Sequence, residues 1–166
     1  MSQRVRRVAL TAHVTASVGW LGAVAAFLAL AVAGVASGDE QRVRGAYVAM
    51  ELTGWYVIVP LSLASLLTGV VQSLGTTWGL FRHYWVVVKL LVTVVATLLL
   101  LLHMGAVSHV AGAATTAALP AGHLGSLRTQ LVADAGAAVV VLLVATALSV
   151  VKPRGLTRYG ARRARA

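Results

Sequence analysis

A histidine stands among apolar residues near the start of the chain, in the stretch HVTASVGWLGAV at residues 13–24. An imidazole can bind a metal ion or exchange a proton near neutral pH. Because an α-helix turns once in about 3.6 residues, His13, Trp20 and Phe27 would share one helix face. His13 is therefore either a tolerated polar residue near a membrane surface or one part of a site.

The stretch WVVVKLLVTVVATLLLLLH at residues 85–103 carries a second set of polar groups. Trp85 and His103 would fall on one line of a helix, and Lys89 would lie about 40° from that line. A charged side chain facing lipid at the bilayer centre costs about 2.5–3.5 kcal/mol. We therefore expect Lys89, and likewise Asp134 further along the chain, to face the interior of a helix bundle.

Four apolar runs supply the helices that must position these groups. The 166 residues are 59% apolar and 11% charged, whereas a soluble domain has about a quarter of its residues charged. Each run reaches the length of about 20 residues that a helix needs to cross a bilayer. Short connections favour antiparallel neighbours, so the sequence predicts an all-α, up-down-up-down four-helix transmembrane bundle. The predicted helices are residues 8–37, 46–74, 85–110 and 131–151.

The first apolar run could be mistaken for a signal peptide, because arginines precede it and small residues follow it. The apolar region of a signal peptide is only about 7–15 residues long. We therefore expect a retained helix.

In the second run, Pro60 is expected to bend the helix, with Ser62 and Ser65 available to bond the backbone groups that it frees.

The basic residues gather at the ends of the apolar runs, with 14 Lys and Arg against 4 Asp and Glu. The positive-inside bias then places both termini and the middle connection in the cytoplasm. We expect one transmembrane domain at residues 1–151 and a basic cytoplasmic tail at residues 152–166, lying on anionic lipids. Because no soluble basic domain exists, nucleic acid is not an expected partner.

Depth along the helices divides the ionisable groups into two layers. His13 and Lys89 lie near the cytoplasmic side with Gln72, whereas Glu51, Asp134 and His103 lie in the outer half. Measured along parallel helices, the two histidines differ in depth by roughly 21 Å, at about 1.5 Å per residue. Two nitrogen ligands on opposite sides of one iron are only about 4 Å apart. One haem therefore cannot use both histidines.

The outer layer contains His103, Glu51 and Asp134, an imidazole and two carboxylates that would suit Zn, Fe, Mn or Cu(II). The chain has no cysteine, so any metal must use nitrogen or oxygen ligands. The alternative is that His103 bonds one carboxylate and closes the bundle. A proton or ion conduit lined by the same three residues also stays open.

The spacing of His13, Trp20 and Gly22 resembles the first-helix motif of two groups of small bacterial membrane proteins, the copper-resistance D family and the membrane-bound J-type protoporphyrinogen oxidases. A tryptophan, Lys89 and an aliphatic run that ends in His103 are similar to a later helix of those proteins. Taken whole, the chain looks closest to a further branch of small four-helix bacterial membrane proteins. The resemblance implies a bacterial plasma-membrane protein with His13, Trp20 and Lys89 at a cofactor site, His13 being a haem ligand.

Together these features predict a membrane protein that binds haem b or a divalent metal ion (Zn, Cu or Fe) inside its bundle and has a redox or cofactor-handling role. The rival class is a non-catalytic accessory subunit that packs through Gly and Ala faces, or a small ion or proton conduit. A homo-oligomer or a membrane-protein partner is compatible with each. No motif suggests hydrolysis or nucleotide use, and whether the protein is an enzyme stays open.

Overall fold

The computed structural model describes residues 2–75, 80–81, 83–115, 123–151 and, in the tail, 155, 157 and 161. Arg82, in the connection between the second and third predicted helices, lies outside the described residues, and so do the remaining residues of the predicted basic tail. Side chains are not described at positions 115, 123 and 124. The elements, in order, are α1 (Gln3–Ala36), α2 (Glu40–Thr53), the π-helical turn η1 (Gly54–Ile58), α3 (Val59–Gly75), α4 (Tyr84–Thr115) and α5 (His123–Val151).

These segments form four helical units that are long and apolar enough to cross a bilayer, because α2, η1 and α3 are continuous. The prediction of an all-helical protein with four membrane-length helices is thus confirmed. The spans are Gln3–Ala36, Glu40–Gly75, Tyr84–Ala114 and Gly125–Val151.

The helices begin earlier than the apolar runs predicted, because polar caps set their ends. The Ser2 side chain accepts a hydrogen bond from the backbone N–H of Val5, and α1 therefore starts at Gln3. Asp39 accepts from the N–H of Gln41 at 2.9 Å and starts α2 six residues before the predicted boundary. Side-chain caps satisfy the free N–H groups of a first helical turn whether or not that turn is apolar. Hydropathy marks only the part of a helix that is suited to lipid.

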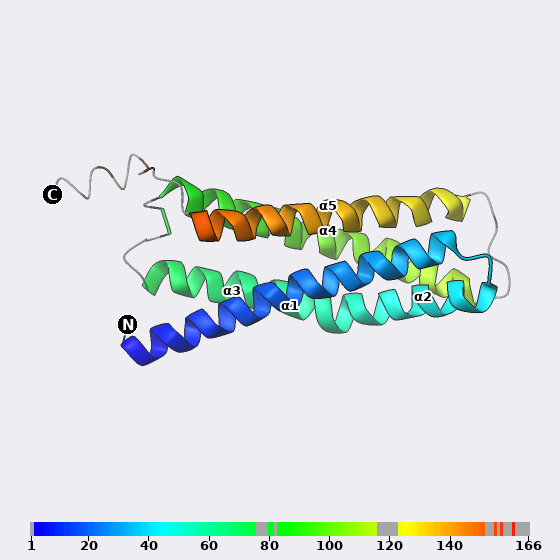
Figure 1. The fold of residues 1–166 in the computed structure, drawn as a ribbon, viewed down its shortest axis with the longest axis horizontal. Helices are drawn as coiled ribbons and strands as arrows, with labels where there is room; N and C mark the ends of the chain where they lie inside the picture. Colours follow the sequence, from blue (N-terminus) through cyan, green and yellow to red (C-terminus); the bar gives the residue numbers. More distant parts are fainter. Residues whose placement is uncertain are drawn as a thin grey trace.

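The four units run alternately up and down (Figure 1). We call the end where α1 begins and α5 ends the proximal end, at the left of Figure 1, and the end where α1 passes into α2 the distal end. The α1 helix packs against α2, α3 and α5, and α4 also packs against α2, α3 and α5. The unit formed by α2, η1 and α3 is therefore diagonally opposite α5, and α1 is diagonally opposite α4.

The second unit changes its hydrogen-bonding pattern just before Pro60. The N–H of Val59 bonds the carbonyl of Gly54, five residues back, which is the π-helical pattern. Proline has no N–H to continue the ordinary ladder, and a π-turn is one way in which a helix absorbs such a break. Ser62 donates to the carbonyl of Val59 at 2.8 Å. The irregularity expected at Pro60 therefore takes the form of a π-turn on its N-terminal side.

The distal half of the bundle is tightly packed. Tyr47, Met50 and Met104 are buried almost completely there. A Cβ atom at Gly34 would lie 2.8 Å from Cζ of Tyr47, so glycine is what allows α1 to approach this ring. Arg128 of α5 donates to the Tyr47 hydroxyl at 2.8 Å and also to the carbonyl of Gly34, and thereby joins three helices. This closed end contrasts with the proximal half.

Candidate functional site

The proximal half of the bundle encloses a cavity of about 670 Å³. Its walls come from all four membrane-length units, through α1, α3, α4 and α5. Small-molecule sites commonly have volumes of about 300–1,000 Å³ and are apolar with a few polar groups. Its lining includes the polar and aromatic side chains Arg6, His13, Trp20, Gln72, Trp85 and Lys89.

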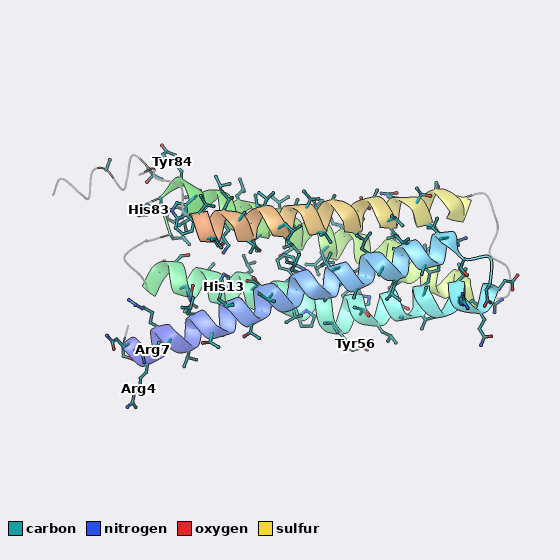
Figure 2. The ribbon with its side chains drawn as sticks, in the orientation of Figure 1. Arg4, Arg7, His13, Tyr56, His83 and Tyr84 are labelled. Carbon is teal, nitrogen blue, oxygen red and sulfur yellow. The ribbon has the colours of Figure 1, made fainter. Side chains whose placement is uncertain are left out.

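His13 is held by α3, beside which its part of α1 runs (Figure 2). Its Nδ1 lies 3.0 Å from the carbonyl oxygen of Ser65 and 3.1 Å from the hydroxyl oxygen of Thr68. The Thr68 hydroxyl donates its own proton to the carbonyl of Ala64. Both partners of Nδ1 are therefore acceptors, so Nδ1 carries a proton. The neutral imidazole then has its lone pair on Nε2.

The Nε2 atom of His13 faces Lys89 of α4, with Nζ at 3.4 Å. The lysine ammonium can donate to the Nε2 lone pair, since Nδ1 already carries the imidazole proton. This contact joins α1 to α4, which are diagonally opposite in the bundle. The structure thus brings together His13 and Lys89, which the sequence placed at one depth, and Gln72 lines the same cavity.

Gly69 leaves room on α3 for the imidazole ring of His13. A Cβ atom at this position would lie 3.1 Å from Cε1 of His13, closer than a comfortable contact. One turn earlier, Ser65 and Ser17 share a hydrogen bond of 2.8 Å between their hydroxyl groups. The sequence pointed to Ser65 only as a partner for backbone groups freed by Pro60, and it did not identify Ser65 or Gly69 as the support of His13. Thr68 was missed, because no periodicity shows which hydroxyl a neighbouring helix will use.

The charges around the cavity have one sign. Arg6 and Lys89 are the basic side chains of the lining, and no Asp or Glu is among the described residues that form it. Positive groups with low-dielectric walls around them attract anions. The cavity is therefore suited to a ligand that carries negative charge.

Trp20 adds a free donor. Its side chain is 4% exposed and lines the cavity, and its indole N–H has no acceptor within the described part of the chain. A buried donor left unsatisfied costs about 1–3 kcal/mol. A bound ligand with an acceptor group would remove that cost. The resemblance implied a cofactor-binding role for Trp20, and the structure places it in the same wall as His13.

In the outer layer, two of the three predicted residues, His103 and Asp134, lie in contact with each other. Nε2 of His103 lies 2.8 Å from a carboxylate oxygen of Asp134, and its Nδ1 lies 2.8 Å from the carbonyl oxygen of Leu99. The Leu99 carbonyl can only accept, so Nδ1 carries a proton. The 2.8 Å contact is an ion-pair distance, and Asp134 Oδ2 has no hydrogen-bond partner among the described residues. The two side chains are 34% and 38% exposed.

Glu51 does not complete a metal site with this pair. No group of three or more His, Asp or Glu side chains that could hold a metal ion occurs among the residues that the structure describes. Glu51 lies on α2, and Asp134, which pairs with His103, lies on α5. The arrangement is the alternative in which His103 bonds one carboxylate. A metal ion bound by all three residues stays a prediction without structural support.

The fold and the cavity define a class: a four-helix protein with membrane-length helices and a basic, partly apolar cavity at one end of the bundle. Comparison of the chain with models of protein families, with curated proteins and with solved structures found no match. The function must therefore be argued from the cavity itself.

Proposed function

We propose that this chain is a multi-pass protein of the bacterial plasma membrane that binds haem b in the proximal cavity and has a redox or cofactor-handling role. The observation that carries the proposal is the anchored imidazole of His13, whose Nδ1 bonds the Ser65 carbonyl and whose Nε2 lone pair is directed away from that anchor. Histidines that bind metals commonly donate their other N–H to a backbone carbonyl, which sets the tautomer.

The donor set of the cavity fits this cofactor. Haem b needs a nitrogen ligand, a mostly apolar pocket and cations near its carboxylates. His13 would supply the ligand, the cavity walls the apolar surface, and Arg6 a cation for one carboxylate. Lys89, whose Nζ is 3.4 Å from Nε2 of His13, would be a second nitrogen ligand once its ammonium group had lost a proton. When bound, haem supplies one-electron redox chemistry.

The proposed orientation puts the proximal end in the cytoplasm. Arg4 and Arg7 lie at the start of α1 (Figure 2), whereas Asp39 and Glu40 lie at the distal end where α2 begins. Basic residues concentrate on the cytoplasmic side of membrane proteins. The proposed haem would then lie in the half of the bilayer nearer the cytoplasm.

An absorption spectrum tests the proposal. The protein is purified from membranes of cells supplied with a haem precursor, and we expect a Soret band with close to one haem per chain. His13→Ala should lose most of that band. His103→Ala is the matched control, because His103 lies outside the cavity lining and should leave the band unchanged. A colourless wild-type protein, or equal Soret bands in the two variants, would overturn the haem proposal.

A second candidate function is favoured by the pair of His103 and Asp134, whose side chains are 34% and 38% exposed and lie 2.8 Å apart. Such pairs occur in proton-conducting membrane proteins. If wild-type protein binds no haem, proton uptake into liposomes that contain it can be followed with a pH-sensitive dye. Uptake that Asp134→Asn abolishes would support the conduit, and uptake equal to that of empty liposomes would exclude it.

A further inference from the structure

An ionisable pair lies where α4 and α5 meet, well inside the membrane-length helices. His103 of α4 and Asp134 of α5 are 2.8 Å apart, and their side chains are 34% and 38% exposed. They lie about 16 Å and 14 Å from the distal ends of their spans, at about 1.5 Å per residue. Ionisable side chains within a membrane span rarely face lipid and usually face protein or water. This part of the surface therefore requires a polar cover.

The pair faces outward and not into the proximal cavity. Leu99, one turn before His103, is exposed, and so are Ala133 and Ala137, which lie on either side of Asp134 in the chain. None of these residues is part of the cavity lining. The α4 and α5 helices lie side by side (Figure 1). The exposed pair thus belongs to the outer side of these two helices.

The α5 part of this outer side has small side chains. Ala133 and Ala137 are exposed and four residues apart, so they share one helix face. A Cβ atom at Gly136 would meet nothing within 4 Å. Small residues at this spacing allow two membrane helices to approach closely. Because the exposed residues of α4 beside the pair, Leu99 and Leu102, are larger, α5 offers the closest approach to another helix.

The charges on this surface are complementary to themselves. A base and an acid lie next to each other, so two copies related by a two-fold axis bring the base of each copy toward the acid of the other. Gln130, exposed one turn before Asp134, carries both a donor and an acceptor and can pair with the same residue of a second copy. A lipid chain offers no polar group, and a partner with charge of one sign would match only one member of the pair.

We infer that two copies of this chain pack through the outer side of α5, around a two-fold axis along the membrane normal, and that their His103–Asp134 pairs cover each other from lipid. The interface is separate from the cavity, because neither residue of the pair lines it. The inference therefore does not rest on the proposed haem.

Crosslinking tests the position of the interface. The chain has no cysteine, so one introduced cysteine can form a disulfide only with the same position of a second copy. Full-length Ala137→Cys is oxidised in liposomes, and we expect most of it to become a covalent dimer. Ala25→Cys is the matched control, because Ala25 is exposed on α1, and it should remain mostly monomeric. Equal crosslinking of the two variants would overturn the inference.

The strength of pairing is measured by energy transfer between copies labelled with donor and acceptor dyes, at increasing dilution in lipid. Ala137→Leu adds bulk at the closest approach and should weaken the dimer at least tenfold, whereas Ala25→Leu should not. The double variant His103→Leu and Asp134→Leu makes the surface apolar and should weaken the dimer several-fold. Circular dichroism confirms that each variant is folded. Wild-type protein that stays monomeric at every dilution would show that lipid covers this surface, and the inference would be wrong.

Discussion

Lys89 Nζ lies 3.4 Å from His13 Nε2, so two diagonally opposite helices meet through a polar contact in the wall of a largely apolar cavity. The imidazole is oriented from the other side by the carbonyl of Ser65. The lone pair on Nε2 therefore points toward the Lys89 ammonium group, or toward a ligand that takes the place of this group.

Lys89 is expected to act as a ligand and not only as a charge. Lys89→Arg keeps the positive charge but removes the amine, and Lys89→Leu removes both. If the neutral amine binds the haem iron, both variants should convert the iron from low spin to high spin, because one nitrogen ligand would be lost. Visible absorption and electron paramagnetic resonance report the spin state. Low-spin iron in both variants would show that Lys89 is not a ligand.

Gly69→Ala should weaken haem binding several-fold. The new Cβ would lie 3.1 Å from Cε1 of His13, and the ring must move away from its anchor on α3 to relieve the contact. Gly136→Ala is the control, because a Cβ there meets nothing within 4 Å. Haem titration of both variants measures the effect. Equal haem affinities of the two variants would mean that the position of the His13 ring does not depend on Gly69.

Gly34→Ala should destabilise the distal end by about 1–3 kcal/mol, the usual cost of overpacking a filled core. Its Cβ would lie 2.8 Å from the Tyr47 ring, which is buried and bonded to Arg128 and so has little freedom to move. Gly45→Ala adds a Cβ in open space and should leave stability unchanged or slightly raised. Thermal unfolding in detergent compares the variants, and similar midpoints would contradict this account of the packing.

Asp134→Asn should have a small effect on stability, about 1 kcal/mol or less, because the partner His103 is about one-third exposed and exposed ion pairs contribute little. It should leave the Soret band unchanged. Glu51→Gln should change the stability even less, since Glu51 is outside any group of three metal-binding side chains among the described residues. If Asp134→Asn and Glu51→Gln instead release the same amount of bound zinc, the three-residue metal site would be restored.

Much of the fold follows from the chain alone. Four apolar runs of membrane length predict four helices, because hydrocarbon leaves a backbone little alternative to bonding itself. The constant rise per residue of a helix also places His13 and Lys89 at one depth when α1 and α4 run in the same direction. That prediction requires no knowledge of which helices touch.

Side-chain partners could not be predicted in the same way. The sequence offered Glu51 and Asp134 as equal partners for His103, and in the structure Asp134 of α5 is the one that pairs with it. The support of His13 likewise depends on which side of α3 packs on α1, because that side carries Ser65, Thr68 and Gly69.

The amino-acid sequence by itself determined the number of membrane-length helices, their alternating direction and the depth of each ionisable group, since these depend on local hydropathy and helix geometry. Only the tertiary structure decided which groups touch, which end of the bundle is packed shut and where the cavity lies. Those features depend on the order in which helices surround one another and on how side chains of different size fill the space between them.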